Sequence, residues 1–261
     1  MSKRIISSLI LIAITCLFLF ALPSHFFVFW VISFVAVGLG EFAELIHRKG
    51  IFVHKYIGML AAIAFCLPFL FGQELLILFI SLLSLFLLQF THKKRDVAIF
   101  TIATTLLGIV YIGWLGSFWT RLIFLSHSKS WILFLLLVCK GGDAGAYLIG
   151  KKFGRHKLIP RISPFKSREG AIGGFIFSIV IALISGYLFL NVSYFHILVL
   201  GALSGIFAQI GDLAESLLKR DADVKDSGKI FPGLGGSLDL IDSLLFSAPV
   251  VYFYLVKIVS V

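Results

Sequence analysis

The chain has 261 residues, of which 59% are hydrophobic and only 14% are charged, and its mean hydropathy is +1.05. Soluble domains carry charges at about a quarter of their residues, so this composition excludes a soluble enzyme and is typical of a protein with several membrane spans. The net charge of +10 would suit a nucleic-acid-binding protein in a soluble chain. Here orientation and anionic lipid account for it, and we expect no nucleic-acid partner.

Nine apolar segments are long enough to cross the roughly 30 Å of hydrocarbon in a bilayer. In chain order they lie at about 5–22, 26–46, 51–71, 74–90, 97–119, 130–150, 171–190, 194–215 and 241–260. The first segment follows a basic N-terminus but lacks an Ala-x-Ala cleavage site, so we expect a retained anchor. The sequence therefore predicts an all-α, polytopic integral membrane protein with about nine transmembrane helices.

Most Lys and Arg residues precede the first span or follow the even-numbered spans. Three such groups are Lys93, Lys94 and Arg95, the cations within 151–168, and those within 219–229. Cationic loops stay on the cytoplasmic side of a membrane. We therefore expect a cytoplasmic N-terminus, an external C-terminus, and a location in the cytoplasmic (inner) membrane with the active site facing the cytoplasm.

The chain divides into two halves by the distribution of its carboxylates. Residues 1–130 hold few, and Glu41 and Glu44 lie near the end of the second span, where we expect them to reach the interface. We assign this half to a scaffold, with homodimer contact or lipid access as further roles. Residues 131–261 hold most of the 13 carboxylates, and their polar loops lie at about 151–170 and 216–240. Acidic groups in membrane spans are costly, so this half is predicted to be catalytic.

The longest polar run follows the eighth span. If that helix continues, Asp212, Glu215, Ser216 and Lys219 lie along one face, since spacings of three and four share a face. Asp239 repeats the spacing with Asp242 at the start of the last span. We expect two helix ends that bring carboxylates together around a hard divalent cation, with Pro232–Gly236 as a flexible turn. Carboxylates without a His or Cys cluster favour Mg²⁺ over Zn²⁺, and a second cation is compatible with them.

Two earlier motifs each allow two interpretations. Asp143 follows Lys140 by three residues and could simply neutralise it, or the glycines beside it could let a ligand approach the backbone. In Ser163–Gly170, Lys166 and a helix N-terminus could bind an anion, or the segment could be a cytoplasmic loop with a helix cap. Gly173 and the neighbouring Gly174 are predicted to serve helix packing.

Together these motifs resemble the signatures of the phosphatidate cytidylyltransferase family, membrane enzymes that make CDP-diacylglycerol from CTP and phosphatidic acid. The matching residues of the long run are Ser216, Lys219, Arg220, Lys225, Asp226, Pro232, Gly233, Gly235, Gly236, Asp239 and Asp242. Asp143-x-x-Ala-Tyr and the Ser163–Gly170 segment are similar to two further family motifs. Leu234 and Leu240 stand where the family usually has His and Arg.

The resemblance implies a nucleotidyltransferase of phospholipid biosynthesis that joins CTP to phosphatidic acid at the bilayer and releases pyrophosphate, with Mg²⁺ as cofactor. It implies metal binding by Asp212 and Asp239, and catalytic roles for both of them and for Ser216, Lys219 and Asp226. The implied substrate-binding residues are Asp143, Lys166, Arg220, Lys225, Gly235, Gly236 and Asp242. Because a phosphomonoester oxygen is already ionised at neutral pH, the reaction needs no activated side-chain nucleophile.

Three alternatives stay open. A CTP-dependent polyprenol or lipid kinase would transfer the γ-phosphoryl group instead. A catalytically degenerate scaffold is compatible with Leu234 and Leu240, since leucine cannot donate to phosphate. An ion-coupled transporter would place Asp143 and Asp212 in broken helices near mid-bilayer, whereas the sequence gathers its polar groups at one face.

Overall fold

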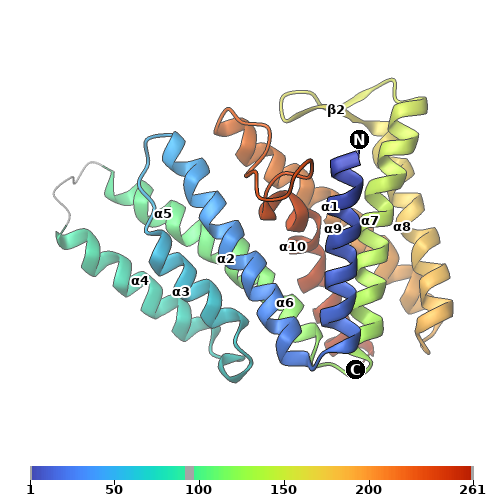
Figure 1. Ribbon diagram of the computed structural model, residues 1–261, viewed down its shortest axis with the longest axis horizontal. Helices are drawn as coiled ribbons and strands as arrows, with labels where there is room; N and C mark the ends of the chain where they lie inside the picture. Colours follow the sequence, from blue (N-terminus) through green and yellow to red (C-terminus); the bar gives the residue numbers. More distant parts are fainter. Residues whose placement is uncertain (1, 92–96, 260–261) are drawn as a thin grey trace. The chain divides into compact units, whose positions relative to one another are not determined.

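The computed structural model describes residues 2–91 and 97–259. The main helices (Figure 1) are α1 Ser2–Cys16, α2 Ser24–Arg48, α3 Lys55–Cys66, α4 Glu74–Thr91, α5 Ala98–Gly108, α6 Leu115–Leu122, α7 Ser128–Phe153, α8 Arg168–Phe189, α9 Tyr194–Asp221 and α10 Ser237–Tyr254. Two short strands, β1 Lys157–Ile159 and β2 Ser163–Ser167, pair antiparallel. Hydrocarbon offers no partner to a peptide group, so an apolar chain satisfies its backbone within helices.

Short helical segments of other types complete these elements. The π-helical turns η1 Leu17–Ala21 and η4 Leu255–Val259 extend α1 and α10, and η3 Ile109–Trp114 joins α5 to α6. The 3-10 turn η2 Pro68–Leu70 follows α3. Several predicted spans are therefore built from two or three consecutive helical segments.

Within the described residues, 8 helical stretches are long and apolar enough to cross a membrane. They confirm an all-α, polytopic membrane protein, but the predicted count of nine is not confirmed. The predicted third span contains α3, whose 12 residues extend only about 18 Å. Pro68 follows α3 closely and holds Leu67 in an extended conformation, which ends the helix. The side of the N-terminus stays a prediction, and Lys93, Lys94 and Arg95, on which it partly depends, lie outside the described residues.

The chain forms two compact units. The first unit comprises Met1–Arg121 and Asp221–Ile241, and the second comprises Leu122–Arg220 and Asp242–Val261. The chain passes from the second unit to the first at the end of α9 and returns to the second unit within α10. The predicted assignment of a scaffold to residues 1–130 and of catalysis to 131–261 stays a prediction.

Small residues let the helices of the first unit approach closely. A Cβ at Gly108 would lie 2.9 Å from the Phe42 ring, and one at Gly113 would lie 2.8 Å from Cα of Ala62. Phe42 and Ala62 have no exposed surface, so α2 and α3 form the core together with the α5–η3 segment. In contrast, α4 exposes large apolar side chains such as Leu75 and Phe90, which suits contact with lipid.

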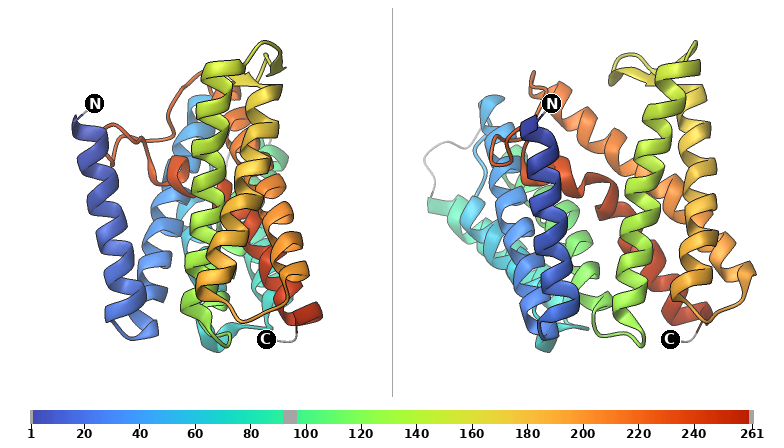
Figure 2. Two further views of the ribbon diagram at one scale, coloured as in Figure 1. Left: turned by 90° about the vertical axis from the view of Figure 1, so that its right-hand side faces the viewer. Right: turned by 45° about the vertical axis from the view of Figure 1, so that its right-hand side comes forward.

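In the second unit, α7 and α8 lie side by side along their length (Figure 2). Cβ atoms at Gly173 and Gly174 would come within 2.6 Å of Ile149 and 2.8 Å of Ala146 on α7. The prediction that this glycine pair serves helix packing is confirmed. Backbones that approach so closely form a rigid frame for the polar side chains carried by α7.

Candidate active site

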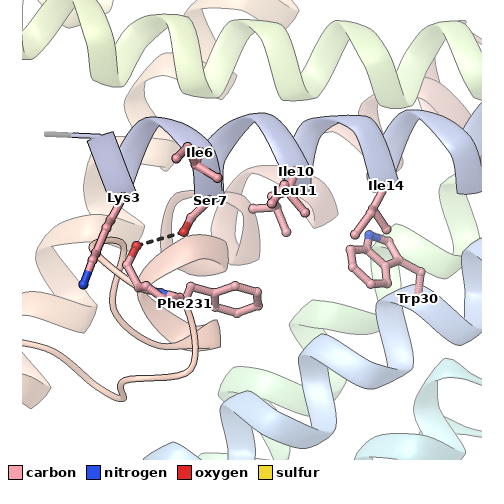
Figure 3. Close-up of a pocket in the computed structure, with 9 residues that line it drawn as sticks. Lys3, Ile6, Ser7, Ile10, Leu11, Ile14, Trp30 and Phe231 are labelled. Carbon is pink, nitrogen blue, oxygen red and sulfur yellow. Dashed lines mark hydrogen bonds between the residues drawn. The ribbon is translucent and has the colours of Figure 1, made fainter.

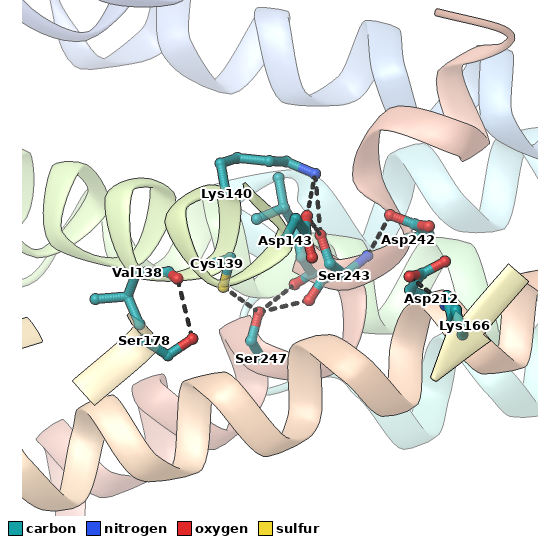
Figure 4. Close-up of polar contacts among 11 residues, drawn as sticks. Val138, Cys139, Lys140, Asp143, Lys166, Ser178, Asp212, Asp242, Ser243 and Ser247 are labelled. Carbon is teal, nitrogen blue, oxygen red and sulfur yellow. Dashed lines mark hydrogen bonds and ion pairs between the residues drawn. The ribbon is translucent and has the colours of Figure 1, made fainter. Parts of the chain in front are cut away.

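A polar cluster in the second unit begins on α7 (Figure 4). The Nζ atom of Lys140 lies 3.4 Å from Oδ2 of Asp143 and donates a hydrogen bond of 3.0 Å to Oγ of Ser243 on α10. Ser243 in turn lies 3.4 Å from the Asp143 carboxylate. The ion pair that the sequence allowed therefore forms, but it is shared with α10. Ser243 was not among the predicted site residues.

A second ion pair joins Lys166 of β2 to Asp212 of α9, and both side chains are about one-third exposed (Figure 4). The strand pair holds Lys166 in place, because Ser167 ends β2 and caps α8 by accepting a hydrogen bond of 3.1 Å from the Gly170 amide. Arg220 of α9 also donates a hydrogen bond of 3.3 Å to the Ile162 carbonyl. The helix expected after this loop begins at Arg168 with a cap, as one of the two interpretations required, and the binding of an anion by Lys166 stays a prediction.

Asp242 lies next to the segment of α9 that carries Asp212. A Cβ at Gly211 would overlap the Asp242 carbonyl oxygen, so only glycine lets α9 and α10 approach this closely. Asp242 is 7% exposed and directly precedes Ser243, whose hydroxyl lies 3.4 Å from the Asp143 carboxylate. The second unit thus gathers three predicted aspartates, with Lys140 and Lys166 as their counter-charges.

Lys219 is held by a carboxylate of its own helix. α9 continues to Asp221, which confirms the predicted polar face, and Lys219 forms an ion pair with Glu215 one turn earlier. Glu215 has no exposed surface, so it fixes the position of the Lys219 ammonium group. Ser216 lies half-buried beside this pair.

The signature loop, which we define as residues 222–236, belongs to the first unit. The amides of Leu234 and Gly235 donate to the Phe231 carbonyl at 3.0 and 3.1 Å, and the Phe231 amide donates to the Gly235 carbonyl at 2.9 Å. Gly233 and Gly235 have φ angles of +81° and +99°, which other residues rarely adopt. The turn is therefore fixed by hydrogen bonds, in contrast to the flexible turn predicted from its glycines.

Asp239 organises this loop from the first turn of α10. Its Oδ2 atom accepts hydrogen bonds from the Ser227 amide and hydroxyl, both at 2.9 Å, and from the Gly236 amide at 2.8 Å. The Gly235 amide is thus bonded within the loop and the Gly236 amide is bonded to Asp239, and the predicted contact of both glycines with nucleotide stays a prediction. Lys225 and Asp226 are exposed on the loop.

The sequence interpretation of Glu41 was wrong. Instead of reaching solvent at the interface, Glu41 is 8% exposed and accepts hydrogen bonds of 2.9 Å from the Ser237 and Leu238 amides and of 3.0 Å from the Ser227 hydroxyl. Its neighbour Glu44 is exposed, as predicted. A carboxylate inside a membrane helix is itself a signal of function, and that signal could have singled out Glu41.

An apolar groove of about 480 Å³ also reaches the signature loop (Figure 3). It is lined by Lys3, Ile6, Ser7, Ile10, Leu11 and Ile14 of α1, by Trp30 of α2, and by Phe231 and Pro232 of the loop. The Ser7 hydroxyl donates a hydrogen bond of 2.9 Å to the Pro232 carbonyl, which ties α1 to the loop. Lys3 lies at one end of the groove, and Trp30 lies toward the other.

Residues 2–258 match the sequence model of the cytidylyltransferase family. The chain belongs to this family. It is 34% identical to the phosphatidate cytidylyltransferase of Bacillus subtilis (strain 168), over 98% of this chain and 97% of that protein. It is 33% identical to the phosphatidate cytidylyltransferase of Synechocystis sp. (100% and 98%) and 38% identical to that of Staphylococcus saprophyticus (67% and 68%). The resemblance inferred from the motifs is confirmed.

The carboxylates of the second unit suit a hard divalent cation by their chemistry, since Mg²⁺ prefers oxygen ligands. Among the described residues, no group of three or more His, Cys, Asp or Glu side chains is arranged to hold a metal ion as it stands. Asp143 and Asp212 instead each face a lysine. The types of donor therefore fit Mg²⁺, but two of these donors, Asp143 and Asp212, are paired with lysine ammonium groups.

Proposed function

We propose that this protein is a phosphatidate cytidylyltransferase, which converts CTP and phosphatidic acid to CDP-diacylglycerol and pyrophosphate in phospholipid biosynthesis. The observation that carries the proposal is the cluster of Asp143, Asp212 and Asp242 with Lys140 and Lys166 in the second unit. Relatives named phosphatidate cytidylyltransferase match the chain over nearly its whole length.

The reaction needs charge neutralisation and alignment more than proton transfer. A phosphate oxygen of phosphatidic acid forms a bond to the α-phosphorus of CTP, and the bond from that phosphorus to the bridging oxygen breaks, so pyrophosphate leaves with the electron pair. The attacking oxygen is already ionised at neutral pH. Lys166 and Lys219, each held by a carboxylate, would place fixed positive charge near the phosphates. Arg220, Lys225, Ser216 and Asp226 complete the proposed substrate contacts.

We propose Mg²⁺ as the cofactor, with Asp212 and Asp239 as ligands and a second cation compatible with the site. When bound, Mg²⁺ would neutralise charge on the triphosphate. The all-oxygen donor set supports this proposal. Asp212 belongs to the second unit and Asp239 to the first, and their pairing on one ion stays a prediction.

For the lipid, we propose that the groove beside α1 holds an acyl chain of phosphatidic acid. Its lining is apolar and its volume lies in the range of ligand pockets. Lys3 at one end offers a cation to the anionic headgroup. Ile10→Trp, which fills the groove, should raise KM for phosphatidic acid and leave KM for CTP unchanged. Leu9→Trp, at the preceding position of the same helix, which is not among the residues that line the groove, is the matched control, and equal effects of the two would contradict this placement.

The distribution of cations supports an active site that faces the cytoplasm, and we also propose a homodimer. In a variant without native cysteines, a cysteine at Phe153 should be protected from an impermeant reagent in intact cells, and one at His127 should react. These positions flank α7. The reverse pattern would overturn the proposed orientation.

Labelled CTP tests the proposed reaction directly. Purified protein with phosphatidic acid and Mg²⁺ should transfer label from α-labelled CTP into lipid and release pyrophosphate. Label that enters lipid from the γ position instead would identify a kinase. Absence of any product, with a related cytidylyltransferase active in the same detergent, would favour a degenerate scaffold or a transporter and refute the proposal.

A further inference from the structure

Glu41 lies on α2, far in sequence from the motifs of the family, yet it accepts three hydrogen bonds, one from the signature loop and two from the start of α10. Its Oε1 atom accepts the Ser237 amide, and its Oε2 atom accepts the Leu238 amide and the Ser227 hydroxyl. Ser237 and Leu238 begin α10, so their amides have no carbonyl partner within that helix. Glu41 therefore caps α10 from a separate helix, and its negative charge interacts favourably with the dipole at the N-terminus of α10.

The same carboxylate explains two glycines of the loop. A Cβ at Gly228 or at Gly236 would overlap the carboxylate of Glu41. Both residues are turned so that the backbone itself packs against this side chain. Gly235 has the corresponding relation to Asp239, since a Cβ there would overlap that carboxylate. The adjacent glycines Gly235 and Gly236 thus each fit closely against a different carboxylate.

Ser227 links the two carboxylates. Its hydroxyl lies 3.0 Å from Oε2 of Glu41 and 2.9 Å from Oδ2 of Asp239, and its amide donates to Asp239. The loop is therefore held at Ser227 and again at Gly236, and Ser237 is held where the chain enters α10. The part between them, with its exposed residues Lys229 and Ile230, depends on these two ends for its position.

We infer that Glu41 is a positioning residue of the transferase reaction: it holds the signature loop and the start of α10, and so keeps Asp239 in the position from which it acts on CTP. This inference rests on the proposed function. It extends the site to α2, in the half of the chain whose sequence indicates only a scaffold. Glu41 acts through the loop, without direct contact with the substrate.

The alternative is that Glu41 only stabilises the fold, as many buried polar groups do. The two roles differ in what a conservative substitution changes. Glu41→Gln keeps the size of the side chain but replaces one acceptor oxygen by a donor, which would face either the Ser237 amide or the Leu238 amide. A positioning role then predicts a looser loop and a lower kcat in protein that remains folded.

The experiment combines steady-state kinetics with a measurement of the loop that needs no activity. With Cys16, Cys66 and Cys139 replaced by alanine, a nitroxide label is placed on Ile230→Cys, a position that is 55% exposed. Glu41→Gln should increase the mobility of the label in its EPR spectrum. In the unlabelled protein it should lower kcat at least tenfold, about 1.4 kcal/mol in barrier, with a smaller change in KM for phosphatidic acid.

Glu44→Gln is the matched control, since it makes the same charge change one turn further along α2 at an exposed position. It should leave both label mobility and kcat unchanged. If folded Glu41→Gln protein has wild-type label mobility and kcat, or loses only thermal stability, the inference is overturned.

If the mobility of the nitroxide rises but the wild-type protein transfers no isotope from labelled CTP into lipid, the proposed function fails. The inference that Glu41 holds the loop then still stands. Where Glu41→Gln does not fold, Ser227→Ala removes only the hydroxyl link. That variant should show smaller shifts in label mobility and kcat in the same directions, and unchanged values of both would equally overturn the inference.

Discussion

Replacing Asp212 by asparagine tests whether this carboxylate acts in catalysis or only forms a structural ion pair. The substitution keeps the side-chain volume but removes the charge that faces Lys166. Both side chains are about one-third exposed, and partly exposed pairs stabilise proteins by only about 1 kcal/mol. Removing a group that stabilises charge in the transition state costs more, about 100- to 1,000-fold in kcat, or about 2.7–4 kcal/mol. We therefore expect Asp212→Asn to lose far more activity than stability.

A double-mutant cycle with Lys166→Met makes the test sharper. If the two residues serve only to hold β2 against α9, each single variant leaves one unpaired charge, and the double variant should recover. If each acts on the reactants, the double variant should be no more active than the worse single variant. The rate of CDP-diacylglycerol formation from α-labelled CTP measures activity, and thermal unfolding in detergent measures stability.

The ion pair between Glu44 and Arg48 provides the control, because both side chains are more than half exposed. The same cycle on that pair, with Glu44→Gln and Arg48→Met, should leave activity near the wild-type value. The catalytic assignment of Asp212 is refuted if Asp212→Asn keeps more than about a third of the wild-type kcat, which corresponds to less than about 0.7 kcal/mol.

Three further outcomes follow from the contacts of the loop and from the donor set. Gly236→Ala should lower kcat/KM for CTP at least tenfold, because its Cβ would displace Glu41. Gly38→Ala should be neutral, since the nearest atom to a Cβ there is 3.6 Å away. Similar values of kcat/KM for the two variants would contradict this prediction. The double substitution Leu234→His and Leu240→Arg should change kcat/KM by less than tenfold, about 1.4 kcal/mol, and strong activation of an inactive protein would instead identify a degenerate enzyme. EDTA should abolish turnover and added Mg²⁺ should restore it, so turnover that persists in EDTA would exclude a required divalent metal.

The sequence predicted best those features that depend on neighbouring residues. The polar face of α9 follows from helical spacing alone, and the start of α8 lies where the Ser163–Gly170 motif ends. The length of α3 was missed because hydropathy alone took the segment 51–71 as one span, whereas Pro68 ends the helix. Local backbone chemistry overrides average hydropathy there.

The site was predicted in part, because a spacing rule reaches only along one element. Lys140 and Asp143 could be paired from their spacing, but Ser243 joins them from 100 residues away from Asp143. Glu41 is 196 residues from Ser237, and its place near the end of the predicted second span suggested an interfacial side chain. For Glu41 the sequence offered one signal, the energetic cost of a carboxylate in a membrane helix. This cost indicates that the carboxylate has a partner but does not identify the partner.

The hydrogen bonds of the loop also bear on the two leucines that depart from the family pattern. A glycine-rich turn can bind phosphate through its amides only if those amides are free to point at the ligand. Here the amides of Leu234 and Gly235 donate to the Phe231 carbonyl, and the Gly236 amide donates to the Asp239 carboxylate. Compensation for the missing His and Arg through the backbone would therefore require these bonds to break. Side-chain cations such as the exposed Lys225 supply the same charge without that cost, so we expect side chains to carry the contact with phosphate.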